Sequence, residues 1–220
     1  MRTHAVFLRL DGRACVVVGG DGMAESKVHA CLQAGAAVTV VAPTLTPDLD
    51  ALARARRIRH VPRAYKTGDL AGAALAYAAV ADAPLIAALR DEAARERVLL
   101  NVIDRPDACD FFAPAVMSRG DLQVAIGTGG SSPGLAAALR RDLEGQLGPE
   151  YGPFVAILGA VRRHLAADPR RIAVMDALLA SPLLDVVRRG ARDEADRLLG
   201  GLVGDGCTLA RLGVSLEARA

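Results

Sequence analysis

The 220-residue chain contains no tryptophan, and aromatic residues make up only 3% of it. Proteins that bind single-stranded nucleic acid usually stack bases on aromatic side chains, so this scarcity argues against that class. The formal net charge is only +2, whereas nucleic-acid-binding domains carry concentrated basic patches. We therefore expect no nucleic acid partner, although a local basic pocket for a small acidic ligand is compatible with this composition.

Long apolar runs are also missing. No stretch of about 18 uncharged apolar residues occurs, which is the length that a membrane-spanning helix needs. Met1 is followed by Arg2, Thr3 and His4 rather than by the apolar core of a signal peptide. We expect no membrane partner and a soluble, cytoplasmic protein.

The sequence also lacks the usual signatures of metal binding. None of the four cysteines, Cys15, Cys31, Cys109 and Cys207, forms a C-x-x-C pair. For Cys15 and Cys31, which lie within apolar segments, a buried thiol is the ordinary interpretation. The histidines show no ligand spacing either; they are His4, His29, His60 and His164. We therefore expect no preformed metal site.

What the chain does have is apolar residues, 52% of the total, in a pattern typical of an α/β fold. In the first half, short β-like runs alternate with helical ones, which indicates βαβ units and a parallel sheet. A strand over residues 5–10 is expected to turn at Asp11-Gly12 into the first buried strand. The other expected elements are strands at 15–18, 37–41, 58–61, 74–80 and 98–103, and helices at 23–34, 46–54 and 84–97.

The second half follows another pattern. Two short strands are predicted around Arg119-Gly120, and Ser132 followed by Pro133 predicts a helix start. Four leucines at spacing four form one apolar stripe suited to a subunit interface; they are Leu135, Leu139, Leu143 and Leu147. Helical segments broken near Pro169 and Pro182 follow, then a glycine-rich break at 200–206. We expect a Rossmann-like dinucleotide-binding domain (1–113), a strand-containing dimerisation region (114–147) and a helical C-terminal region (148–220).

The stretch ACVVVGGDGMAESKV, residues 14–28, resembles a dinucleotide-binding turn. Gly19 and Ala24 match the first and last positions of the fingerprint G-x-G-x-x-G/A. Asp21 stands at its middle position, where the fingerprint has glycine. A tight turn without a ligand is the alternative interpretation. The acidic residue expected after the second strand is missing, so NAD and NADP are not distinguished. The candidate cofactor-binding residues are Gly19, Gly20, Asp21, Gly22, Met23, Ala24, Pro43 and Thr44.

Asp21 bears on this interpretation because its carboxylate repels phosphate. At about 4 Å the repulsion is on the order of 4 kcal/mol at an effective dielectric constant of 20. Two arrangements avoid the conflict. Gly22 allows an altered turn that directs Asp21 outward, or Asp21 bonds ribose hydroxyls while the diphosphate binds further along the helix start.

A more specific resemblance lies in NVIDRPDACDFFAPAVMSRGDLQVAIGTGGSSPGLA, residues 101–136. This segment resembles the precorrin-2 dehydrogenase and sirohydrochlorin ferrochelatase family in four successive motifs. They are an N-V-x-D turn, F-x-x-P, an R-G-x-L-x-V-A-I strand and a T-G-G-x-S-P-x-L-A helix start. This family forms the N-terminal module of siroheme synthases. FLRLDGRACVVVGG, residues 7–20, matches the start of the family pattern.

This resemblance implies an activity and its residues. The expected reaction oxidises precorrin-2 to sirohydrochlorin with NAD as cofactor, and some members also insert ferrous iron. The catalytic aspartate of the family falls on Asp104, which would take the proton as hydride leaves. On the residues alone, the favoured interpretation of Asp104 is a turn aspartate that bonds its own backbone. The family's architecture also implies a homodimer.

The same resemblance suggests how a substrate rich in carboxylates is held. The glycine-rich segment before the Ser132 helix offers N–H groups, and arginines supply charge, although some of these are ordinary solvated residues. Thr128 falls where a serine is phosphorylated in some members. The candidate substrate-binding residues are Arg105, Arg119, Thr128, Gly129, Gly130, Ser131 and Ser132, with Arg140 and Arg141 as further cations. A chelatase without hydride transfer and a non-catalytic tetrapyrrole-binding or redox-sensing module stay open as alternatives.

Overall fold

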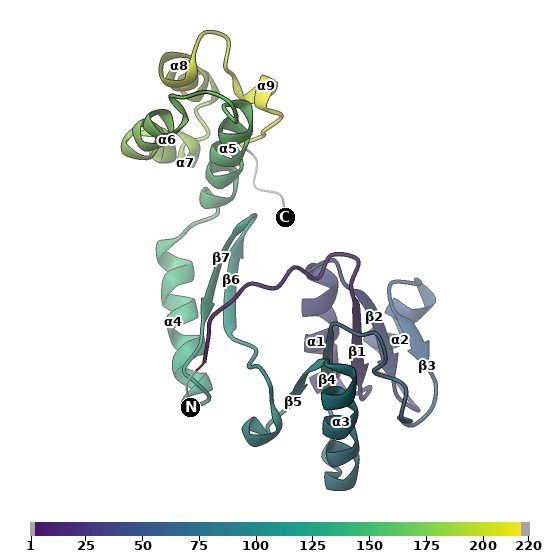
Figure 1. The fold of residues 1–220 in the computed structure, drawn as a ribbon. Coiled ribbons are helices and arrows are strands. Elements are labelled where there is room, and N and C mark those ends of the chain that lie inside the picture. The colour runs from purple at the N-terminus through teal and green to yellow at the C-terminus, as the bar shows by residue number, and fades with distance from the viewer. Residues whose placement is uncertain (1–2, 217–220) are drawn as a thin grey trace. The chain divides into compact units, whose positions relative to one another are not determined.

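The computed structural model describes residues 3–216. The chain divides into two compact units, residues 1–113 and 114–220, each of which is described by itself (Figure 1). The finer division into dinucleotide-binding, dimerisation and helical regions stays a prediction.

The first unit is built on a parallel five-stranded sheet in the order β3-β2-β1-β4-β5. Its central strand β1 (Ala14–Val18) is buried at four of its five positions, because both of its faces are covered. The chain passes from β1 to β2 on one side and later returns to place β4 on the other side. The remaining strands are β2 (Ala37–Val41), β3 (Arg59–Val61), β4 (Leu75–Ala78) and β5 (Leu99–Val102).

Helices cover both faces of this sheet. Helix α1 (Gly22–Gln33) and helix α2 (Pro47–Arg54) pack on one face, in a core that includes Val17. Helix α3 (Ala83–Glu96) packs on the opposite face with Val16 and Val18. The alternation along β1 sends its valines into two separate cores, so the parallel α/β fold predicted for the first half is confirmed (Figure 1).

The second unit contains a hairpin and six helices among its described residues. Strands β6 (Ala115–Arg119) and β7 (Leu122–Ile126) pair antiparallel, and helix α4 (Pro133–Gln146) packs against them. The later helices surround a core of their own, which includes Ile157, Leu178 and Leu199. They are α5 (Tyr151–His164), α6 (Arg171–Ala180), α7 (Leu183–Arg188), α8 (Arg192–Val203) and α9 (Leu209–Leu212).

Two local predictions are wrong. Residues 5–10 form no strand, and Val6, Phe7 and Leu8 are exposed. The reason is that β2 and β4 occupy both edges of β1, so the expected hairpin partner finds no free edge. The glycine-rich break is also shorter than expected, because Gly200 and Gly201 lie inside α8. Among the described residues, no helix has the length and apolar character needed to cross a membrane.

Candidate functional site

The glycine pair at the end of β1 is required by close backbone packing. Gly19 has φ 120°, and a Cβ there would lie 2.4 Å from the carbonyl oxygen of Ala79. A Cβ on Gly20 would lie 2.1 Å from the carbonyl oxygen of Thr44. Any side chain at either position would therefore displace the neighbouring chain. Gly22 differs, because a Cβ there would meet no atom within 4 Å, which leaves this part of the turn open to a ligand.

Asp21 is the N-cap of α1. Its backbone is extended, and its Oδ1 accepts hydrogen bonds from the N–H groups of Met23 and Ala24, both at 3.1 Å. These first-turn N–H groups are the ones that hold a diphosphate in dinucleotide-binding turns. The exposed Asp21 carboxylate therefore occupies the anion position at the start of the helix.

Pro43 and Thr44 lie beside this turn at the carboxyl end of β2, and both are exposed. The Thr46 N–H donates to the Gly20 carbonyl oxygen at 3.0 Å, which ties the two loops together. Thr46 also caps α2 through its hydroxyl, which accepts a hydrogen bond from the Leu49 N–H at 3.3 Å.

The loop after β1 lies at the switch point of the sheet, between β1 and β4, where chain connections leave in opposite directions, and the loop after β2 adjoins it. Ligands of open α/β sheets bind at that place. The open surface at Gly22 and the exposed loop after β2 fit a dinucleotide. The negative charge of Asp21 opposes it, as does that of Glu25 in the first turn of α1.

Asp104 follows the carboxyl end of β5, as Gly19 follows the carboxyl end of β1, so both lie at the same end of the parallel strands. Its backbone is left-handed, with φ 60°, a conformation that aspartate and asparagine adopt more readily than most residues. Its side chain is exposed and has no hydrogen-bond or ion-pair partner among residues 3–113. A turn role through the side chain is therefore absent within this unit, and the carboxylate is available to a ligand.

Arg105 follows directly and is also exposed. Its guanidinium contacts Asp107, with Nε 3.4 Å from Oδ1, and this contact lowers the pKa of Asp107 below its usual value. The pair is at the surface, so Arg105 can leave Asp107 at little cost to meet an anionic ligand.

The glycine-rich loop before α4 is ordered by its own hydroxyl groups. Thr128 Oγ1 accepts a hydrogen bond from the Ser132 N–H at 3.1 Å, and the Thr128 carbonyl accepts one from the Ser131 N–H at 3.0 Å. Gly129 and Gly130 have φ of 61° and 82°, so this turn requires glycine. Ser132 caps α4 by accepting from the Leu135 N–H at 3.3 Å, as the sequence predicted.

The arginines of the second unit make contacts within it. Arg119 donates from Nε to the Leu147 carbonyl at 3.0 Å and from Nη2 to the Glu144 carbonyl at 3.3 Å, so it satisfies the open carbonyl groups at the end of α4. Arg140 forms an ion pair with Glu144, and Arg141 is exposed. Substrate binding by these cations stays a prediction.

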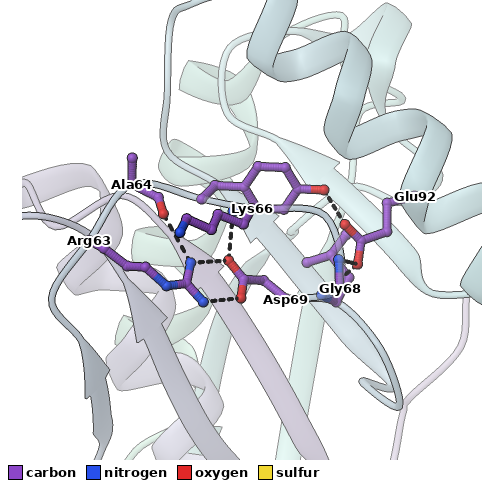
Figure 2. A network of polar contacts seen from close by, with 8 residues as sticks. Arg63, Ala64, Lys66, Gly68, Asp69 and Glu92 are labelled. Carbon is purple, nitrogen blue, oxygen red and sulfur yellow. Dashed lines mark hydrogen bonds and ion pairs between the residues drawn. The ribbon is translucent and has the colours of Figure 1, made fainter.

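A buried polar network that the sequence did not predict lies on the face of the sheet that α3 covers (Figure 2). Glu92 is 1% exposed, and it accepts hydrogen bonds from the N–H groups of Gly68 and Leu70, both at 2.9 Å, and from the Tyr65 hydroxyl. Burial, together with this carboxylate, raises the pKa of Tyr65. One signal was available, since Glu92 follows Leu89 by three residues on the apolar side of α3.

The same crossover segment, residues 62–74, carries a second contact. Arg63 pairs with Asp69 through two hydrogen bonds of 2.7 Å, and this pairing lowers the pKa of Asp69. Together, the two contacts hold an irregular segment on the face of the sheet that α3 also covers.

Comparisons with known proteins agree with this geometry. Residues 6–115 match the model of the family described as "Putative NAD(P)-binding", and residues 119–146 match the family described as "Sirohaem biosynthesis protein central". The chain is 36% identical over 198 residues to a siroheme synthase of Thioalkalivibrio sulfidiphilus, covering 88% of this chain and 40% of that protein. It is 36% identical over 200 residues to a siroheme synthase of Chromobacterium violaceum, covering 89% and 42%.

The fold is also that of a solved structure named SirC, precorrin-2 dehydrogenase. The TM-score is 0.75 at 24% identity, with 91% of this chain and 98% of that chain covered. The chain spans about two fifths of the length of the siroheme synthases that it matches. The sirohaem biosynthesis central region follows in residues 119–146, and, with its model matching residues 6–115, the chain belongs to the family described as "Putative NAD(P)-binding".

Proposed function

We propose that this protein is an NAD-dependent dehydrogenase that oxidises precorrin-2 to sirohydrochlorin in siroheme biosynthesis. The family supports a nicotinamide cofactor, and the relatives named siroheme synthase support the pathway. A protein of the same fold carries the name precorrin-2 dehydrogenase. The observation that carries the proposal is the position of Asp104. Its carboxylate has no partner in its own unit, and it lies at the carboxyl ends of the parallel strands, where the glycine turn also lies.

The oxidation removes one hydride and one proton from the substrate. NAD, when bound, accepts the hydride. In this proposal the turn from Gly20 to Ala24 holds the diphosphate, and the loop at Pro43 and Thr44 contacts the adenosine part. Asp104 accepts the proton from the carbon skeleton, because an ionised carboxylate near the substrate is the general base that this step needs.

Substrate carboxylates need cations and N–H donors. Arg105 is the nearest cation to Asp104 in sequence, and its exposed guanidinium is held only by a surface contact with Asp107. In the second unit, the Ser131 and Ser132 N–H groups are bonded to Thr128, so the N–H groups that this loop offers to an anion are those of Gly129 and Gly130, just before α4. We propose Arg105 as a substrate contact of the first unit and, separately, the glycine-rich loop and Arg119 at the end of β6 as anion contacts of the second unit.

The proposal extends to assembly and location. Leu135 and Leu139 on α4 are 52% and 41% exposed, and Val116 on β6 is 45% exposed. These exposed apolar side chains support a homodimer, in which a second copy of the chain would bury them. All four cysteines are free thiols, which supports a reducing compartment such as the cytoplasm. For iron insertion, ferrous iron would be a substrate that meets Asp104 and the pyrrole nitrogens.

Anaerobic incubation of the protein with precorrin-2 and NAD tests the main proposal. We expect reduced nicotinamide and sirohydrochlorin to form together, and neither to form when NAD is left out. A second reaction, with sirohydrochlorin and ferrous iron but no NAD, measures chelation separately. Iron insertion without hydride transfer would make the protein a chelatase, and sirohydrochlorin binding without either reaction would make it a binding module.

A further inference from the structure

Strand β5 is at the edge of its sheet, so part of its backbone has no neighbouring strand. Two side chains from the returning segment 109–110 meet this edge. Asp110 Oδ2 accepts a hydrogen bond from the Leu100 N–H at 2.9 Å, and Cys109 Sγ accepts one from the Val102 N–H at 3.2 Å. The Asp110 N–H donates in turn to the Leu100 carbonyl at 2.8 Å. The segment after the Asp104 turn is thus bound to the strand before it.

The sulfur of Cys109 contacts the backbone on both sides of Asp104. Sγ lies 3.1 Å from the carbonyl oxygen of Val102 and 3.2 Å from the carbonyl oxygen of Arg105. Asn101 reaches the same region, with its Nδ2 3.6 Å from Sγ and 2.8 Å from the Phe111 carbonyl oxygen. A single thiol therefore connects the residue at the end of β5 with the residue after Asp104.

The Cys109 thiol is suited to this role because it stays protonated. Burial raises its pKa above the ordinary value of a cysteine, so near neutral pH the S–H can donate to a carbonyl while the sulfur accepts from the Val102 N–H. A charged thiolate would lose the donor. The contacts thus describe a structural thiol with both of its hydrogen-bonding functions in use.

The turn needs such support. Asp104 has φ 60°, and a non-glycine residue in a sparsely populated conformation persists only when its surroundings fix it. Its own side chain makes no hydrogen bond or ion pair within residues 3–113. The conformation that presents the carboxylate therefore depends on neighbours, and Cys109 is the side chain that contacts the backbone on both sides of Asp104.

We propose that Cys109 is a positioning residue for Asp104, holding the turn in the conformation in which the carboxylate meets the substrate. This inference rests on the proposed function, in which Asp104 is the base. It assigns to the thiol no chemistry of its own.

Three variants of the full chain test the inference. Cys109→Val replaces the sulfur with a slightly larger branched apolar group and removes both hydrogen-bonding functions. Cys109→Ser keeps a donor and an acceptor, and Cys109→Ala gives a second result if the valine variant does not fold. We expect kcat for precorrin-2 oxidation to fall roughly tenfold or more in the valine variant, since a misplacement of about 1 Å can cost 10²-fold. The KM for NAD should stay unchanged, and serine should recover most of kcat.

The matched control is Cys207→Ala, which removes a buried thiol from the helical core of the second unit and should leave kcat unchanged. Amide hydrogen exchange of residues 102–105 should become faster in the valine variant and return toward the wild-type rate in the serine variant. If the wild type is active and a folded valine or alanine variant has a normal kcat, the inference is wrong and the proposed function still stands. A wild type without NAD-dependent turnover would overturn the proposed function, and the inference with it.

Discussion

The carboxylate of Asp21 accepts a hydrogen bond from the backbone N–H of Ala24 at 3.1 Å, and so caps the helix whose start is the expected place of the cofactor diphosphate. The cap stabilises α1 by satisfying N–H groups that would otherwise lack a partner. The same bond places a negative charge where a phosphate would bind. NAD must therefore displace this carboxylate, or bind beside it, when it occupies the turn.

This competition predicts that removal of the charge strengthens NAD binding. Asp21→Asn retains a good N-cap without charge, and Asp21→Gly frees the N–H groups at a cost of only a few tenths of a kcal/mol to the helix. We expect tighter binding in both, by up to about tenfold, because water and salt screen an exposed charge. Titration calorimetry measures the dissociation constants.

The salt dependence provides the control for this prediction. If charge repulsion is the cause, the difference between the wild type and Asp21→Asn should shrink as the salt concentration rises. Weaker NAD binding in Asp21→Asn would contradict the prediction and would instead make Asp21 a ligand of the ribose hydroxyls.

Asp104→Asn should abolish most of the oxidation of precorrin-2 while the protein stays folded. Asparagine tolerates the left-handed backbone at this position, so the turn is kept and only the base is lost. Loss of a general base typically reduces the rate 10²- to 10⁴-fold. The measurement is the rate of NAD-dependent sirohydrochlorin formation at saturating NAD.

Alanine is the less informative substitution at this position, because a residue without a short polar side chain costs about 1–2 kcal/mol in the left-handed region. NAD titration of Asp104→Asn confirms that the cofactor site is intact. Near-normal turnover in this variant would remove Asp104 from the mechanism.

The exposed leucines of α4 predict a homodimer in solution. Leu139→Gln replaces an apolar side chain with a good helix former, so α4 should persist while association weakens. The control is Leu179→Gln on α6, which changes a leucine that is 59% exposed outside the predicted interface. Equilibrium sedimentation at micromolar concentration should show a dimer for the wild type and for Leu179→Gln, and a larger share of monomer for Leu139→Gln. A monomeric wild type would exclude this assembly.

Glu92→Gln should destabilise the first unit. The amide oxygen can still accept from the Gly68 and Leu70 N–H groups, but the NH₂ group then faces the Tyr65 hydroxyl, which loses its acceptor. An unsatisfied buried group costs about 1–3 kcal/mol, and urea unfolding measures the free energy of unfolding. Glu96→Gln changes an exposed carboxylate at the end of the same helix and should have little effect. Equal stability of the two variants would show that the network contributes nothing.

Much of the local structure was already predictable from the sequence. The positions of β1 and β2, the cap of α2 at Thr46 and the cap of α4 at Ser132 follow from apolar periodicity and from side chains within three residues of the helix start. Those signals depend on neighbours in sequence, so a linear pattern contains them. The family motifs also placed Asp104 after β5, although its role is still a prediction.

The tertiary structure decided what depends on partners distant in sequence. Residues 5–10 look like a strand, but β1 is central and both of its edges are taken. Glu92 and Cys109 look like a surface acid and an isolated thiol, yet each is held by backbone groups that only the packed fold brings to it. The N-cap role of Asp21 in α1 was not expected, and the two arrangements expected for its carboxylate toward a cofactor stay predictions. A sequence pattern indicates which groups need a hydrogen bond or burial. Three-dimensional packing determines the partner with which each group forms that contact.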